Sequence, residues 1–65
     1  MEDDYLSIEE ASGLSRVSPD GLAQLRYKGR GPRYLKPTPK TVLYRRSDVL
    51  AWLESTAVEP GVRTA

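Results

Sequence analysis

Glycine and proline are concentrated between residues 29 and 39, and they limit what the chain can form there. Proline lacks a backbone N–H and clashes with the preceding helical turn, so no helix can run through Gly31-Pro32. Pro37-Thr38-Pro39-Lys40 cannot continue a sheet ladder and must turn. The chain is therefore expected to form helices before this region, a turn within it and separate elements after it.

The segment before the glycines and prolines predicts two short helices joined by a tight turn. Ser7 followed by Glu10 is a capping box, and the apolar spacing after it predicts a helix that ends near Ser15. Ser18-Pro19-Asp20 combines a hydroxyl cap, a proline at the first helical position and an acid in the first turn. It predicts a second helix over residues 19–28.

The segment after Pro32 predicts a β-hairpin and a third helix. Residues 33–36 and 41–45 have strand character, since the second stretch is β-branched and aromatic. Tyr44 is expected to pack in the core. Ser47-Asp48 is expected to cap the third helix. The buried face of this helix would be Val49, Trp52, Leu53 and Thr56, with Trp52 closing the core.

Charge is segregated along the chain. Residues 1–20 hold six acidic residues and one arginine, residues 21–46 hold eight lysines and arginines with no acid, and residues 47–65 hold three acids and one arginine. The basic segment would attract a polyanion such as nucleic acid, although a solvated basic loop balanced by its flanks has the same composition. The expected domain spans residues 5–56, between an acidic arm (1–4) and a disordered tail (57–65).

The residue types present exclude several classes of function. The chain has no cysteine and no histidine, so it lacks disulfides, thiolate metal sites and the commonest general base. Glu9 and Glu10 diverge on their helix, and Gly29-Arg30-Gly31 lacks the rest of a phosphate-binding loop. We therefore expect no enzymatic activity, cofactor, metal or small-molecule substrate. No apolar run is long enough for a membrane span, and the acidic start is not a signal peptide.

The order helix, turn, helix, basic hairpin, helix resembles the winged helix-turn-helix domains of phage and prophage excisionases. AlpA-like regulators and the DNA-binding domain of MerR-type activators are close relatives of these. The resemblance covers nearly all of residues 5–55 and is carried by residues 5–11, 17–19, 29–36 and 42–53. It implies an α+β, mainly α fold, a small winged helix-turn-helix, that binds double-stranded DNA in a bacterial cytoplasm. Asp20 and Gly21 depart from the family pattern, and so do Leu43 and Leu50.

The resemblance also implies which residues meet DNA, with the second helix in the major groove and the hairpin along the adjacent backbone or minor groove. Gln24 could pair with adenine, or it could simply be an exposed residue that favours helix. Asp20 could accept a hydrogen bond from cytosine, or it could only stabilise the helix dipole. The expected contacts of the second helix are Ser18, Asp20, Ala23, Gln24, Tyr27 and Lys28. Those of the wing and backbone are Arg26, Arg30, Arg33, Lys36, Lys40, Arg45 and Arg46.

Three functions fit this surface. The first is an excisionase, a recombination directionality factor that binds and bends attachment-site DNA and steers an integrase. The second is a small transcriptional regulator, and the third is a module that binds an acidic protein partner. Leu43 and Leu50, expected near the surface, are candidates for contact between neighbouring copies on DNA.

Overall fold

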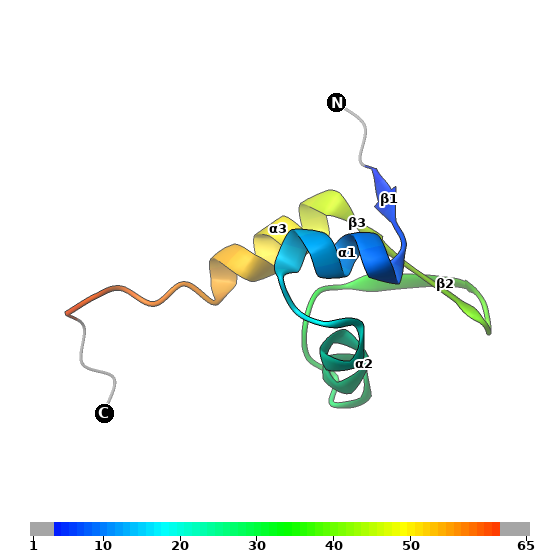
Figure 1. Ribbon diagram of the computed structural model, residues 1–65, viewed down its shortest axis with the longest axis horizontal. Helices are drawn as coiled ribbons and strands as arrows, with labels where there is room; N and C mark the ends of the chain where they lie inside the picture. The colour runs from blue at the N-terminus through cyan, green and yellow to red at the C-terminus, as the bar shows by residue number, and fades with distance from the viewer. Residues whose placement is uncertain (1–3, 62–65) are drawn as a thin grey trace.

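Three helices and a three-stranded antiparallel sheet make up the computed structural model, which describes residues 4–61. In chain order the elements are β1 (Tyr5–Leu6), α1 (Ile8–Ser15), α2 (Pro19–Tyr27), β2 (Tyr34–Thr38), β3 (Thr41–Arg45) and α3 (Arg46–Ser55). The hairpin of β2 and β3 projects from the helices on one side, and residues 56–61 leave on the other (Figure 1). This mainly helical α+β fold is the one expected. No helix among residues 4–61 has the length and hydropathy needed to cross a membrane.

Both predicted helix starts are present. The backbone N–H of Ser7 donates to Glu10 Oε1 at 2.8 Å, and the N–H of Glu10 donates to Ser7 Oγ at 3.1 Å. At the start of α2, Ser18 Oγ accepts from the N–H of Gly21 at 3.0 Å. The two helices are therefore fixed by local hydrogen bonds that satisfy N–H groups of their first turns.

The loop that follows α2 folds back onto it. The N–H of Arg30 donates to the carbonyl of Leu25 at 2.8 Å. Gly31 has a φ of +84°, and a Cβ there would lie 3.0 Å from Leu25 Cβ. Glycine is required at this position because a side chain would be strained by the backbone and crowded by the helix. Because the loop packs on α2, the strand β2 that follows it begins close to this helix.

The sheet contains one strand that the sequence did not predict. Its order is β1-β3-β2, and the short β1 pairs Tyr5 with Arg45 and Leu6 with Tyr44. The hairpin also differs from expectation, since β2 continues through Pro37 to Thr38. An edge strand tolerates a proline, and the register shifts between Leu35 and Thr38. The connection between the strands is therefore Pro39-Lys40 alone.

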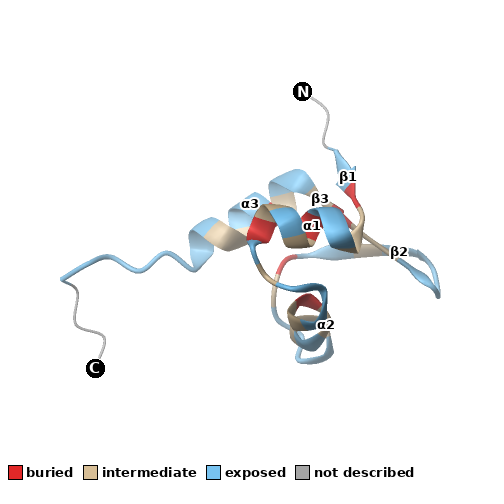
Figure 2. Cartoon of the chain, viewed as in Figure 1, coloured by how far each residue is buried: buried red, intermediate tan, exposed pale blue. Residues whose placement is uncertain are grey.

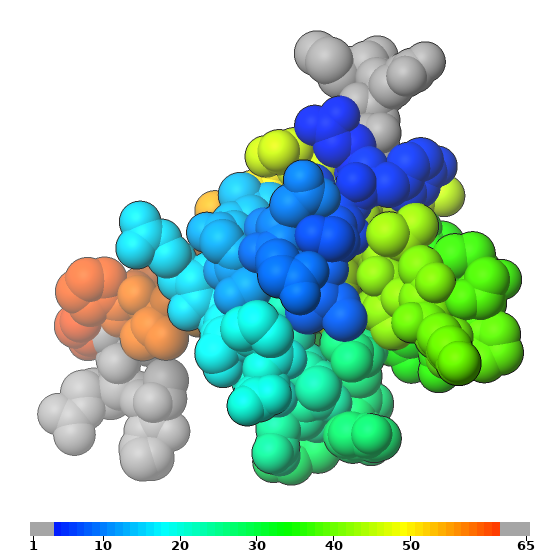
Figure 3. Space-filling model, turned by 45° about the vertical axis from the view of Figure 1, so that its right-hand side comes forward, coloured from blue at the N-terminus to red at the C-terminus, as the bar shows by residue number. Residues whose placement is uncertain are grey.

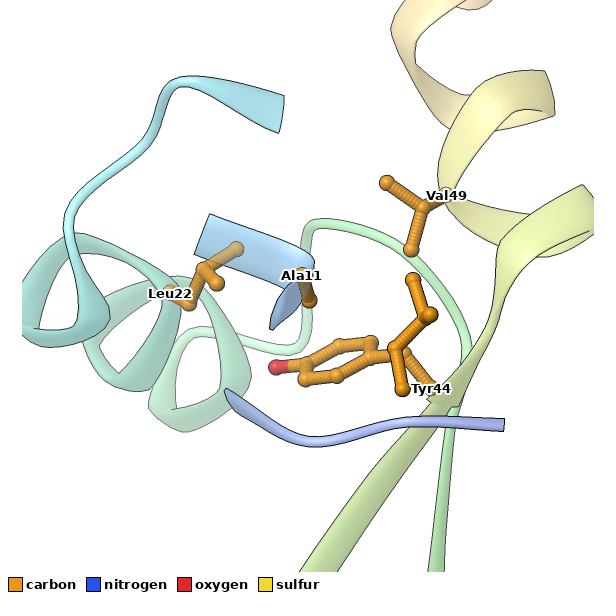
Figure 4. Packing of buried hydrophobic residues seen from close by; sticks show 5 residues of the cluster. Ala11, Leu22, Tyr44 and Val49 are labelled. Atoms are coloured by element: carbon orange, nitrogen blue, oxygen red, sulfur yellow. The ribbon is translucent and has the colours of Figure 1, made fainter. Parts of the chain in front are cut away.

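The core is closed by a tyrosine rather than by the tryptophan. Tyr44 is fully buried, and Figure 4 shows its ring between the helices, near Leu22, Ala11 and Val49. Leu6 completes the cluster. Trp52 was expected to close the core, but it is only half-buried and lies outside this cluster. The buried residues gather where the helices meet β3, whereas the hairpin tip is exposed (Figure 2).

The start of α3 explains the position of Trp52. The helix begins at Arg46, directly after β3, and its N-cap Arg45 makes no side-chain capping bond, so the expected cap at Ser47-Asp48 is wrong. Val49 and Leu53, four residues apart, then face the core. Trp52 lies on the flank of that stripe, and Thr56, expected to be buried, is exposed at the end of the helix.

The ends of the chain lie partly outside the described residues. Of the expected acidic arm only Asp4 is described, and it is exposed. Of the expected tail, residues 57–61 are exposed and follow α3 without helical structure, and residues 62–65 are outside the described part.

Burial predicts how two leucines differ in their contribution to stability. Leu22→Ala should lower the free energy of unfolding by about 2–5 kcal/mol, because it opens a cavity in the core. Leu50→Ala removes the same atoms from a residue that is 44% exposed and should cost less than about 1 kcal/mol. Urea denaturation followed by circular dichroism measures both, and equal losses would contradict this assignment of the core.

Candidate nucleic-acid interface

A groove lies between α2 and the hairpin, and it is the place where the structure joins the two predicted DNA-binding elements. Its volume is about 310 Å³, and it is lined by residues of α2, by both strands and the turn of the hairpin, and by Ile8 of α1. In Figure 3, α2 lies at the bottom of the molecule and the hairpin lies at its right. The lining residues are Ile8, Ala23, Arg26, Tyr27, Tyr34, Lys36, Pro39, Lys40 and Val42.

The exposed face of α2 matches the helical periodicity. Asp20, Gln24, Tyr27 and Lys28 are all exposed, and Tyr27 is 92% exposed. Ala23 is half-buried and lines the groove. Near the beginning of the helix, the Ser18 hydroxyl already accepts the capping hydrogen bond, so only its remaining hydrogen-bonding capacity is available to a ligand. The predicted face therefore remains open to a large partner.

The cations of the hairpin lie near this face. Lys36 and Lys40 line the groove, whereas Arg30 and Arg33 are exposed on the segment that leads into β2. Side-chain hydrogen bonds hold the turn around Lys40, because the Thr38 hydroxyl donates to Thr41 Oγ1 at 2.9 Å and accepts from the N–H of Lys40 at 3.3 Å. The turn thus presents Lys40 from a defined backbone position.

Arg26 is a half-buried residue of the groove and is hydrogen-bonded within the protein. Its Nη1 donates to the Tyr44 hydroxyl at 2.8 Å, and its Cζ lies 5.8 Å from the centroid of the Tyr34 ring. The two tyrosine rings are 6.3 Å apart and tilted by 53°. The sequence predicted Arg26 as a contact to DNA and did not indicate its tyrosine partners. A partly buried arginine requires a hydrogen-bond acceptor, and a tyrosine hydroxyl of the hairpin was one acceptor that the sequence offered.

Arg45 and Arg46 are not part of the groove. Arg46 Nε lies 3.2 Å from Asp4 Oδ2, and its backbone N–H donates to the Asp4 carbonyl at 3.0 Å. Both arginines were expected to contact DNA, so the contact of Arg46 with Asp4 is a finding of the structure. Arg45 Nε is buried and has no hydrogen-bond partner among the described residues. Both arginines thus lie where β3 passes into α3.

Leu43 and Leu50 differ in their surroundings. Leu43 is half-buried and lines an apolar depression of about 390 Å³ together with Tyr5, Leu35, Lys36 and Pro37. Successive side chains of a strand point to opposite faces, so Leu43 lies on the face opposite the buried Tyr44. Leu50 is exposed on α3 and is not among the residues that line the depression.

Comparison with known proteins assigns the domain to a family. Searches among curated proteins and among solved structures each gave no significant match. The chain does match the model of the helix-turn-helix domain over residues 5–57, a stretch that contains all three helices and the whole sheet. Such domains place their second helix against DNA, which agrees with the open face of α2. The chain therefore belongs to the helix-turn-helix domain family and is a DNA-binding protein.

Proposed function

We propose that this protein binds double-stranded DNA in a sequence-specific manner, with α2 in the major groove and the hairpin along the adjacent backbone or minor groove. The observation that carries the proposal is the shared groove, because it joins the open face of α2 to Lys36 and Lys40 of the hairpin. A major groove about 12 Å wide admits a helix, and a neighbouring cationic ribbon can then meet the phosphates. This arrangement favours DNA over an acidic protein partner.

The proposed contacts divide into two kinds. The α2 contacts, Ser18, Asp20, Ala23, Gln24, Tyr27 and Lys28, include the base readout, led by the exposed amide of Gln24. Phosphate contacts fix the register of the protein on the duplex and carry little sequence information. We assign them to Lys28 at the end of α2, to Arg30, Arg33, Lys36 and Lys40, and to Arg45 and Arg46 at the flank, where Arg46 keeps N–H groups beyond the one facing Asp4.

The two kinds of contact predict different responses to substitution. Gln24→Ala should relax discrimination at one base pair by about 1–3 kcal/mol while leaving the salt dependence unchanged. Lys40→Ala should weaken binding to all sequences equally. It should also make the negative slope of log K against log salt less steep by about 0.9. Fluorescence anisotropy with a footprinted site and its single-base variants, over a range of KCl concentrations, measures both. A change of slope for Gln24→Ala would contradict its assignment to base readout.

Among DNA-binding functions we propose an excisionase, which bends attachment-site DNA and steers an integrase toward excision. The support is the resemblance of residues 5–55 to excisionase domains together with the groove described above. Footprinting on attachment-site DNA, followed by an in vitro excision assay with the cognate integrase, tests it. Footprints at a promoter without any effect on excision would instead favour the small transcriptional regulator, which would use the same surface.

We also propose that copies bound at adjacent DNA sites contact one another through Leu43 and Leu50. The depression around Leu43 is apolar and lies on the opposite face of the sheet from Tyr44, so DNA in the α2 groove leaves it accessible. An exposed apolar surface of this kind is typical of a protein contact site.

This proposal predicts a selective loss of cooperativity. Leu43→Ser combined with Leu50→Ser should reduce binding to two adjacent sites while leaving affinity for one isolated site nearly unchanged. Val58→Ser is the matched control, because Val58 is 81% exposed and lies beyond α3. Gel-shift titrations on one-site and two-site DNA compare the variants. A similar loss on both DNAs would overturn the contact surface.

A further inference from the structure

Arg26 occupies a different environment from the other cations near the groove. Lys28, Lys36 and Lys40 are exposed, whereas Arg26 is half-buried and directed at two tyrosines of the hairpin. One of its N–H groups donates to the Tyr44 hydroxyl at 2.8 Å, and its Cζ lies over the Tyr34 ring, 5.8 Å from the centroid. These contacts connect α2 to β2 and β3 at the groove.

The geometry points to Arg26 as a positioning residue that sets the spacing between α2 and the hairpin and so acts on DNA affinity through shape rather than through its charge. This inference rests on the proposed function, because it concerns the same groove. It assigns Arg26 a role different from the phosphate contact expected from the sequence.

The chemistry of arginine fits this role. A planar guanidinium can donate a hydrogen bond in its plane while its face lies against an aromatic ring, whereas a lysine ammonium is a flexible point charge without such a face. Tyr44 is fully buried in the central strand and Tyr34 stands opposite it in the register of the hairpin, so both partners of Arg26 lie in the paired part of the hairpin next to the core. An α2 held by these contacts reaches DNA already at the correct distance from Lys36 and Lys40.

The first test measures the spacing in the free protein. The chain has no cysteine, so spin labels at Gln24→Cys and Lys40→Cys report the distance between α2 and the hairpin turn by pulsed electron resonance. Arg26→Gln and Arg26→Lys should each broaden or shift this distance distribution. Lys28→Gln, which removes an exposed cation from the end of the same helix, should leave it unchanged.

The second test measures DNA affinity against salt with the unlabelled proteins. Arg26→Gln should weaken binding by about tenfold at every salt concentration, which corresponds to one lost hydrogen bond to a charged group, with no change of slope. Arg26→Lys should behave like Arg26→Gln although it keeps the charge. Lys28→Gln should instead make the slope of log K against log salt less steep by about 0.9, as expected for a lost phosphate contact.

The outcomes separate this inference from the proposed function. An unchanged distance with a lower slope for Arg26→Gln, together with full rescue by Arg26→Lys, would make Arg26 a phosphate contact and overturn the positioning role. Unchanged distances in both Arg26 variants would overturn it as well. If the unaltered protein fails to bind duplex DNA, the proposed function fails, and the label distances still decide whether Arg26 sets the spacing. All variants are compared at a temperature where near-ultraviolet circular dichroism shows that they are folded. If Arg26→Gln does not fold, both tests are made with Arg26→Lys alone.

Discussion

The burial of one aromatic side chain, Tyr44, holds the parts of this domain together. It lies in the central strand, pairs with Leu6 on one side and Tyr34 on the other, and packs in a cluster with residues of all three helices. It is the largest fully buried side chain among the described residues, and its hydroxyl accepts a hydrogen bond from Arg26. In a chain of 65 residues, which can bury only a modest core, a single side chain with these contacts determines how the helices and the hairpin are arranged.

Elements fixed by neighbours in sequence were predictable, and those fixed by distant residues were not. The Ser7–Glu10 box and the Ser18 cap act within three residues, so the starts of α1 and α2 follow from the sequence. The two residues of β1 become a strand only by pairing with Tyr44 and Arg45, almost forty positions later. The position of Trp52 could not be predicted either, because it depends on where β3 passes into α3.

The candidate site divides in the same way. The open face of α2 follows from helical periodicity, and the structure leaves Asp20, Gln24, Tyr27 and Lys28 exposed as expected. The sequence also indicated that the basic residues would gather on the hairpin. It did not distinguish cations that are free to meet a ligand from those bonded within the protein, such as Arg46 with Asp4 and Arg26 with Tyr44. That distinction depends on pairs 42 and 18 residues apart, whose geometry arises only in the folded chain.

Pro37 has a consequence for the behaviour of many copies at high local concentration. Edge strands present unpaired N–H and carbonyl groups that can recruit a strand from another molecule and start aggregation. In β2 the proline removes one of these donors, and the shifted register beside it interrupts the regular row. The opposite edge, β1, is only two residues long. The sheet can therefore hold a strongly β-forming central strand, Thr41–Arg45, between two edges that have little tendency to recruit other strands.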